Sequence, residues 1–536
     1  MQRNSEKKIH LFSRAYPVCR RFIPQGRWQK VIARTESLEF FADILNTMAA
    51  ELQLPEYLGE LARLEFYIFS LEADGMQPYD FSDKLSINQT LELFENSWKN
   101  LASQIDEEGG QQPVPERGNE HVIIWRQPIN GRIRIKPVSR EDLLAMKMAI
   151  EELTVSEVAR QGKVPTAVVD AALIRALKEG IIIGPEPRIK RHFKPENYND
   201  IDRSFFAARV FSLQWHITQA CDLHCRHCYD RSQYKSLSLE QETGILDDLG
   251  DFCSAHKIHG QVTFTGGNPL LHPNFERLYQ KAADRGFTTA ILGNPTTREQ
   301  LERLNAIQPL AFYQVSLEGL EQHNDYIRGK GHFKRVLAFL DLLRDLDIFS
   351  MVMLTLTQDN MDQVLALAEI LRHKTDLFTF NRLSLVGEGA NLAAVDKDKY
   401  PGFLKEYIQA VGSNPCLGIK DNLLNIIYHE QNRPLFGGCT GFGCGAAFNF
   451  ITVLADGSVH ACRKFPSALG NILANTLSEI YHSEVAERYR AGSRECRDCS
   501  IRPVCGGCLA VAHSHGRDVF TEKDPYCFIA SKDEMI

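Results

Sequence analysis

The sequence has no long apolar run, no excess of positive charge and no apolar N-terminal segment. Its longest apolar stretch, near Phe349 to Leu356, is far shorter than the roughly 20 residues that a membrane-spanning helix needs. Residues Met1 to Phe22 mix charged and apolar side chains, so neither a secretory signal nor a lipid anchor is predicted. With 61 basic and 68 acidic residues, the formal charge of -7 argues against a general binder of nucleic acid or of anionic membranes. We therefore predict a cytoplasmic protein with no nucleic-acid and no membrane partner.

Isolated cysteines are also few. Only Cys19, Cys253 and Cys416 of the 14 cysteines stand alone, and we expect buried free thiols at these positions. The others fall into two groups at metal-like spacings, which favours metal binding over disulfides. The chain of 536 residues is long enough for about three or four domains.

The first cysteine group is the loop Cys221-Asp222-Leu223-His224-Cys225-Arg226-His227-Cys228-Tyr229, which follows the apolar run Phe211 to Ile217. A closed iron-sulfur or zinc site needs four protein donors, whereas this loop supplies three. The spacing therefore indicates a cluster with one iron left open to another ligand. The alternative is a zinc site that takes a fourth donor from elsewhere in the chain.

Residues 1–104 are predicted to form a helical domain. Leu58, Leu61 and Leu64 follow a helical period, and a second helix is predicted from Asn88 to Ser103. Residues 105–120 contain glycine and proline and almost no large apolar side chains, which is typical of a linker.

Residues 121–187 are predicted to form a small winged helix. Asn130-Gly131 is a strong hairpin signal, and Ser139 with Asp142 forms a capping-box pattern at the start of a helix. The predicted elements are two strands at His121–Gln127 and Arg132–Val138, helices from Ser139 to Leu153, Ser156 to Gln161 and Pro165 to Glu179, and a returning strand at Ile181–Ile183.

Three roles are open for this winged helix: peptide recognition, DNA binding and a purely structural role. The third helix carries Asp170 and Glu179 beside Arg175 and Lys178, which is a poor match to a phosphate-lined groove. Recognition of a peptide that adds a strand to the hairpin edge needs backbone pairing rather than charge.

Residues 209–400 alternate apolar runs with helical patterns, which predicts an α/β fold, a partial (β/α)6 TIM-like barrel of parallel strands. The predicted strands are Phe211–Ile217, Gln261–Thr265, Thr288–Leu292, Phe312–Leu317, Ser350–Thr357 and Phe378–Leu385. Functional residues in such barrels lie at the C-terminal ends of the strands. The cysteine loop follows the first strand, and small or polar residues follow the next three: Gly266-Gly267-Asn268-Pro269, Gly293-Asn294-Pro295 and Ser316-Leu317-Glu318-Gly319.

The second cysteine group lies in residues 401–536 and has eight members, which is two complete sets of four. A zinc ribbon is the alternative for the pairs Cys496/Cys499 and Cys505/Cys508, but only five residues separate these pairs. The eight cysteines are Cys439, Cys444, Cys462, Cys496, Cys499, Cys505, Cys508 and Cys527.

The cysteine loop and the strand ends resemble the radical S-adenosylmethionine (SAM) enzymes, whose defining motif is C-x3-C-x2-C followed by an aromatic residue. The resemblance implies that Cys221, Cys225 and Cys228 hold a 4Fe-4S cluster whose open iron binds SAM. Gly266 to Pro269 resembles the family's GGEP segment, which binds the SAM amino group, but Asn268 replaces the glutamate and removes its charge. The residues implied to contact SAM are Tyr229, Gly266, Gly267, Asn268, Pro269, Asn294, Ser316, Glu318 and Arg328. The alternative for Arg328 is the cap of a surface helix.

The C-terminal cysteines resemble the SPASM domain, which implies two auxiliary 4Fe-4S clusters and three clusters in all. The resemblance assigns Cys439, Cys444, Cys462 and Cys508 to the first auxiliary cluster, and Cys496, Cys499, Cys505 and Cys527 to the second. The chain has two residues before Cys508 where the family usually has three, which leaves the assignment of Cys508 open. Eight bound thiols leave no open auxiliary iron, so we predict electron relay rather than substrate ligation.

Residues 121–187 resemble the PqqD-like elements that recognise leader peptides, and the overall order resembles the thio(seleno)oxazole-type maturases. These resemblances imply a radical SAM maturase that cleaves SAM reductively to a 5'-deoxyadenosyl radical. The radical would abstract hydrogen from a ribosomally made peptide and install a crosslink, a thioether or an oxidised ring. The implied partners are a precursor peptide with a leader and a low-potential electron donor such as ferredoxin or flavodoxin. The alternatives are a SPASM enzyme that acts on a protein, as anaerobic sulfatase maturases do, and an iron-sulfur regulator that binds DNA.

Overall fold

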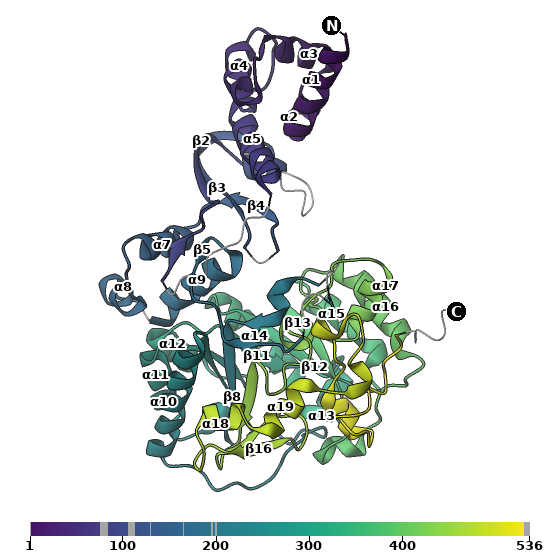
Figure 1. Ribbon diagram of the computed structural model, residues 1–536. Coiled ribbons are helices and arrows are strands. Elements are labelled where there is room, and N and C mark those ends of the chain that lie inside the picture. The colour runs from purple at the N-terminus through teal and green to yellow at the C-terminus, as the bar shows by residue number, and fades with distance from the viewer. Residues whose placement is uncertain are drawn as a thin grey trace. The chain divides into compact units, whose positions relative to one another are not determined.

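The computed structural model describes residues 2–75, 84–105, 113–128, 130–164, 166–193, 197–198 and 201–529, arranged in two compact units. Unit 1 combines residues 1–154 and 172–186, and unit 2 combines residues 155–171 and 187–536. Figure 1 labels their helices and strands. Within the described ranges, no helix is both long and apolar enough to cross a membrane.

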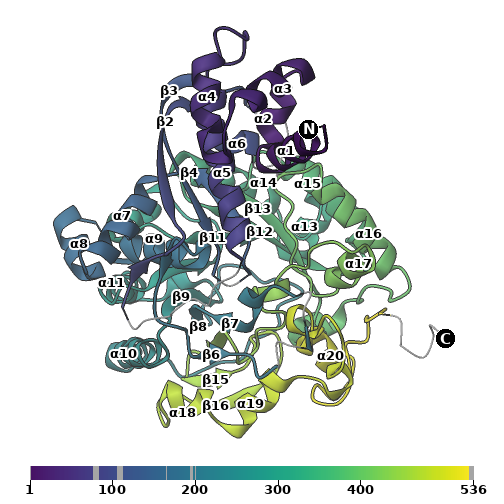
Figure 2. The same ribbon diagram turned by 45° about the horizontal axis from the view of Figure 1, so that its top comes forward.

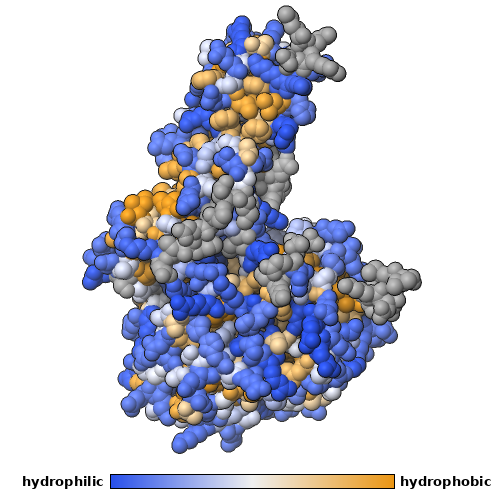
Figure 3. Space-filling view, viewed as in Figure 1, coloured by the Kyte–Doolittle hydropathy of each residue, from blue (hydrophilic) through white to orange (hydrophobic). Residues whose placement is uncertain are grey.

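Unit 1 begins with five helices: α1 (Gln2–Ala15), α2 (Pro17–Phe22), α3 (Gln25–Arg34), α4 (Phe41–Met48) and α5 (Leu58–Asp74). They enclose a small core in which the rings of Tyr16 and Phe41 stack with their centroids 4.2 Å apart. Figure 3 shows hydrophobic residues at the surface of this part of unit 1. Leu11 on α1 and Phe22 on α2 are among the exposed hydrophobic side chains.

The helix predicted from Asn88 to Ser103 is wrong. This segment forms strand β2 (Glu92–Lys99) and the one-turn helix α6 (Leu101–Ile105). Strand β2 pairs antiparallel with β3 (Glu116–Arg126), which pairs on its other side with β4 (Ile133–Pro137). Helix α5 packs along this three-stranded sheet, and Figure 2 shows it beside β2, β3 and β4.

The predicted linker at residues 105–120 also differs from the structure. Residues 116–120 belong to β3, and residues 106–112 lie outside the described ranges. Because β2 and β3 join the helical segment to the hairpin, residues that the sequence assigned to separate domains pack in one unit.

The hairpin of β3 and β4 is present, and the capping box of Ser139 and Asp142 forms with both of its hydrogen bonds at the start of α7 (Arg140–Ile150). Two further helices follow, α8 (Val155–Gly162) and α9 (Thr166–Glu179). The returning strand β5 (Ile182–Ile183) pairs with β1 (Ser86–Ile87) and does not join the hairpin sheet.

Unit 2 contains the predicted run of six parallel strands. They are β8 (Val210–Thr218), β9 (His259–Gly266), β10 (Thr288–Leu292), β11 (Phe312–Ser316), β12 (Ser350–Leu356) and β13 (Leu377–Arg382). The strands neighbour one another in chain order. The helices between them are α10 (Leu239–His256), α11 (Phe275–Asp284), α12 (Arg298–Ile307), α13 (Glu321–Arg328), α14 (His332–Asp345) and α15 (Val364–Leu371).

The barrel stays open because the C-terminal region extends its sheet. Strand β14 (Phe450–Val453) pairs in parallel with β8, and β15 (Ser458–His460) and β16 (Ala468–Asn471) follow in antiparallel order. The remaining C-terminal helices are α16 (Tyr400–Val411), α17 (Leu424–Glu430), α18 (Leu477–Tyr481), α19 (Glu484–Ala491) and α20 (Leu509–Ser514). Two short strands, β6 (Ile189–Lys190) and β7 (Ala207–Ala208), precede the barrel.

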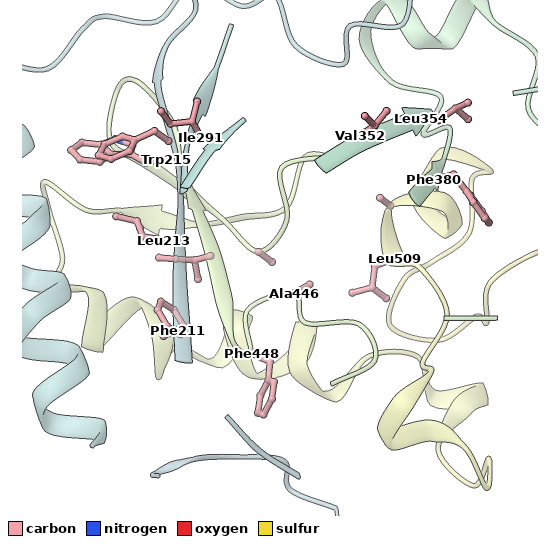
Figure 4. Packing of buried hydrophobic residues seen from close by; sticks show 14 of the residues in the cluster. Phe211, Leu213, Trp215, Ile291, Val352, Leu354, Phe380, Ala446, Phe448 and Leu509 are labelled. Carbon is pink, nitrogen blue, oxygen red and sulfur yellow. The ribbon is translucent and has the colours of Figure 1, made fainter. Parts of the chain in front are cut away.

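One hydrophobic core joins the barrel to the C-terminal region. Figure 4 shows Phe211 and Leu213 on β8 together with Phe448 and Leu509 of the C-terminal region, all members of one buried cluster. This shared core holds the barrel strands, whose C-terminal ends carry the predicted site residues, next to the region with the C-terminal cysteines.

Candidate active site

The cysteine loop begins directly after β8 and has no regular secondary structure of its own. Backbone hydrogen bonds fix it, because Arg226 N donates to Ile327 O (3.0 Å) and Cys228 N donates to Cys225 O (3.2 Å). Cys221 is exposed, whereas Cys225 and Cys228 are half-buried. Burial raises the pKa of the Cys225 and Cys228 thiols, so a bound cation is needed to hold them as thiolates at neutral pH.

Gly266 and Gly267 are required where the end of β9 meets the residues before the cysteine loop. Gly267 N donates to Thr218 O (2.8 Å), and Gly266 has a φ of +134°. A side chain on Gly266 would collide with Thr218 O, and one on Gly267 would collide with Ala220 O. The glycines thus allow two backbones to approach closely beside the cluster loop.

Asn268 and Asn294, from the ends of β9 and β10, converge on Asp222 in the cysteine loop. The side-chain amides of Asn268 and Asn294 both donate to Asp222 Oδ1, at 2.9 and 2.6 Å, and that of Asn294 also lies 3.8 Å from Cys221 Sγ. Sequence reasoning singled out both asparagines but missed Asp222, because an acidic residue in a loop has no distinguishing spacing.

Arg328 and Glu318 form a buried ion pair. Arg328 Nε and Nη2 donate to Glu318 Oε1 at 2.8 and 2.6 Å, and Glu318 Oε2 accepts the backbone N–H of Thr355 (2.8 Å). Although burial acts to raise it, His227 and Arg328 hold the pKa of Glu318 below its usual value. Arg328 Nη1 lies 3.8 Å from Cys225 Sγ.

A cavity of about 500 Å³ lies at the C-terminal ends of the barrel strands, and the three loop cysteines line part of it. Of the residues predicted to contact SAM, Tyr229, Gly266, Gly267, Asn294, Ser316 and Arg328 line it. Asn268, Pro269 and Glu318 are not among the described residues that line it, and neither is Asp222. Both oxygens of Glu318 accept hydrogen bonds, one from Arg328 and the other from the backbone of Thr355.

Tyr229 is paired with a histidine that sequence reasoning missed. Its hydroxyl shares a hydrogen bond of 3.1 Å with Nε2 of His216, which lies on β8 and lines the same cavity. Burial lowers the pKa of His216 to about 3, so this imidazole is neutral. The pair gives the cavity wall an uncharged polar contact beside Cys228.

The eight C-terminal cysteines gather around two separate cavities. Four thiols line the first, which has a volume of about 140 Å³: Cys439, Cys444, Cys462 and Cys508. The other four line the second, of about 20 Å³: Cys496, Cys499, Cys505 and Cys527. Burial raises the pKa of Cys444 to about 12 and that of Cys508 to about 11, so these thiols also need a cation in order to ionise.

A search for groups of three or more His, Cys, Asp or Glu side chains that could hold a single metal ion finds none among the described residues.

The cavity of about 500 Å³ and the first cysteine cavity share part of their lining. Asn381, Arg382, Arg463 and Lys464 line both.

Comparison with known families gives two matches. The radical SAM superfamily matches residues 215–371, and an iron-sulfur cluster-binding domain, SPASM, matches residues 444–500. The chain therefore carries a radical SAM domain followed by a SPASM domain, and the first match contains the cysteine loop and the ends of β8 to β12.

Individual proteins are similar over parts of the chain. The antilisterial bacteriocin subtilosin biosynthesis protein AlbA of Bacillus subtilis (strain 168) is 28% identical over 54% of this chain. The match covers 65% of that relative's length, which is less than two thirds. Fe-coproporphyrin III synthase of Methanosarcina barkeri (strain Fusaro) is 25% identical over 60% of this chain and 88% of its own. The crystal structure of Streptococcus suis SuiB bound to precursor peptide SuiA has a TM-score of 0.50 at 15% identity, over 76% of this chain and 96% of that one, which shows a shared fold.

Proposed function

We propose that this chain, which carries a radical SAM domain and a SPASM domain, is a maturase that modifies a ribosomally made peptide. One observation carries the proposal: the cysteine loop and the next three strand ends meet around one cavity, and this cavity shares lining residues with a set of four further thiols. When bound, the cluster and SAM would supply a 5'-deoxyadenosyl radical that takes hydrogen from the substrate.

The protein's own residues would bind and orient these groups. Cys221, Cys225 and Cys228 would hold the first cluster, and the paired Arg328 would receive the carboxylate of SAM. The two sets of four C-terminal thiols would hold auxiliary clusters that accept an electron from the substrate, and the enclosing barrel would keep water and oxygen from the radical. A ferredoxin or a flavodoxin would supply the low-potential electron.

A peptide substrate is favoured by the open edge of the three-stranded sheet in unit 1. The sheet order is β2-β3-β4, so β4 has a strand on one side only among the described residues. Gln127 N donates to Arg132 O and Val138 N donates to His121 O, so the alternating antiparallel ladder turns the backbone groups of Ile133 and Ile135 outward. A leader peptide would add here as a further strand, as the PqqD-like resemblance implies.

Binding of DNA by the same region is disfavoured by its ion pairs. Arg175 on α9 lies 3.7 Å from Glu141, and Glu179 accepts a hydrogen bond from Lys136. These pairs reduce the positive charge that α9 would present to phosphates. The thio(seleno)oxazole-type product and the cytoplasmic location are part of this proposal.

The proposal is tested by anaerobic purification and assay. About twelve irons per chain are expected from three 4Fe-4S clusters, and dithionite with SAM should yield 5'-deoxyadenosine. Full iron loading without any 5'-deoxyadenosine would refute it. Co-expression with the short open reading frames beside the gene, followed by mass spectrometry, should then show a mass change in one peptide.

A second candidate is a tetrapyrrole substrate, which the similarity to Fe-coproporphyrin III synthase favours. The two candidates are distinguished by which substrate accelerates the formation of 5'-deoxyadenosine. A peptide that accelerates 5'-deoxyadenosine formation and gains a modification supports the maturase. Acceleration by coproporphyrin alone supports the second candidate.

A further inference from the structure

We infer that the carboxylate of Asp222 receives the amino group of SAM in this protein, in place of the glutamate that Asn268 replaces. The inference rests on the proposed function, because it assigns a role within the same SAM site. It moves the negative charge from the end of β9 to the cysteine loop.

The hydrogen bonds of Asp222 leave one of its oxygens open. Asn268 and Asn294 both donate to Oδ1, at 2.9 and 2.6 Å, and no described residue donates to Oδ2. Both asparagines are buried, whereas Asp222 is exposed. The two neutral amides therefore fix the orientation of the carboxylate. Asp222 does not itself line the cavity of about 500 Å³, but its neighbours Cys221 and Leu223 and its partner Asn294 do, so the uncommitted oxygen belongs to a residue at the edge of that cavity.

Two other carboxylates at this end of the barrel, Asp230 and Glu318, are already occupied. Asp230 accepts hydrogen bonds from Gln219, Ser232 and Tyr234. Glu318 accepts hydrogen bonds from Arg328 and from the backbone of Thr355. Of these three acidic side chains, Asp222 is the one with an uncommitted oxygen.

The polar groups beside the cluster thiols match the two ends of an amino acid. The side-chain amide of Asn294 donates to Asp222 and lies 3.8 Å from Cys221 Sγ. The cationic Arg328 lies 3.8 Å from Cys225 Sγ. SAM ends in an α-amino group, which donates hydrogen bonds, and an α-carboxylate, which accepts them. An amino group toward Asp222 and a carboxylate toward Arg328 satisfy both ends in one orientation.

The competing account is that Asp222 only ties the cysteine loop to the ends of β9 and β10. Two expectations distinguish SAM binding by Asp222 from this purely structural role. First, the charge should be able to change places with its hydrogen-bonding partner, so Asp222→Asn combined with Asn268→Glu should restore function. Second, the charge should matter only for ligands that carry the amino group.

The test measures SAM affinity of the anaerobically reconstituted full-length protein by equilibrium dialysis, with iron and sulfide counted for each variant. We expect Asp222→Asn to weaken SAM binding by about tenfold or more, because a charged hydrogen-bond acceptor is lost. The double variant should recover most of that affinity. A SAM analogue with hydrogen in place of the α-amino group should bind the unmodified protein and Asp222→Asn equally.

The matched control is Glu321→Gln, which removes the same charge from the surface helix α13, where Glu321 pairs with the exposed Lys334. Equal SAM affinity of Asp222→Asn and the unmodified protein would overturn the inference. A double variant that holds full iron but binds SAM as weakly as Asp222→Asn would also overturn the inference. If Asp222→Asn alone fails to load its cluster, the SAM affinity of the double variant is compared with that of the unmodified protein instead. Failure of the unmodified, iron-loaded protein to bind SAM would instead refute the proposed function.

Discussion

Arg382, the last residue of β13, is a buried cation held between two carboxylates. Its guanidinium donates to Asp421 at 2.8 Å and to both oxygens of Asp524 at 2.9 and 2.7 Å. Asp524 also accepts the backbone N–H of Cys508 (2.8 Å). A single side chain thus connects a barrel strand to a cysteine of the first C-terminal set.

Replacing Arg382 with methionine should destabilise the protein strongly. The substitution leaves two buried carboxylates without their cation, and such a loss costs about 3–5 kcal/mol. We expect a lower midpoint of urea unfolding and, because Cys508 loses its positioned neighbour, fewer irons per chain. Arg298→Met is the control, since its partner Asp345 is exposed and such pairs contribute about 1 kcal/mol or less. Equal midpoints for the two variants would contradict the prediction.

At the scale of elements, the barrel strands were predictable from the sequence. Each is a short apolar run bounded by glycine, proline or polar residues, and buried parallel strands require that composition on both faces. The strand Thr288–Leu292 was predicted to the residue, and the others within a few residues. The same local signal placed the cysteine loop and the three following strand ends.

Strand β2 was mispredicted as a helix because its conformation depends on distant partners. Its side chains pack onto α5 and the residue before it: Phe94 contacts Tyr67 of α5, and Trp98 contacts Tyr57, with ring centroids 5.6 and 5.7 Å apart. Strand propensity measures such packing more than backbone preference. Asp222 was missed for a related reason, because its role appears only when the ends of β9 and β10 bring two amides to it.

The open edge of β4 gives a prediction about peptide recognition. Ile135→Pro removes one outward N–H without removing a hydrogen bond to β3, so the sheet should persist. We expect weaker binding of the precursor peptide, measured by fluorescence anisotropy of its labelled leader, with unchanged 5'-deoxyadenosine formation in the absence of peptide. Ile135→Val keeps the N–H and serves as the control. Unchanged leader affinity in Ile135→Pro would exclude strand addition at this edge.

At the scale of the whole molecule, the three thiol groups differ in exposure and completeness. The cysteine loop has three thiols and includes the exposed Cys221, whereas each C-terminal set has four thiols and Cys505 is buried. The sets of four also lie in a region with short helices and strands, between residues 437 and 529, where bound metal would contribute to folding. The three proposed clusters should therefore not be lost together.

We predict that oxidation removes iron in two stages. Titration with ferricyanide should first lower the iron content from about twelve to about eight per chain and abolish 5'-deoxyadenosine formation. Excess SAM should slow this stage, because it occupies the open iron. Proteolytic cleavage between residues 437 and 529 should begin only in the second stage, when the four-thiol sets lose their metal. A variant with serine at positions 221, 225 and 228 should start near eight irons and show the second stage alone. Cleavage of the C-terminal region during the first stage would contradict the prediction, because it would show that loss of the loop cluster already destabilises the region of the two sets of four.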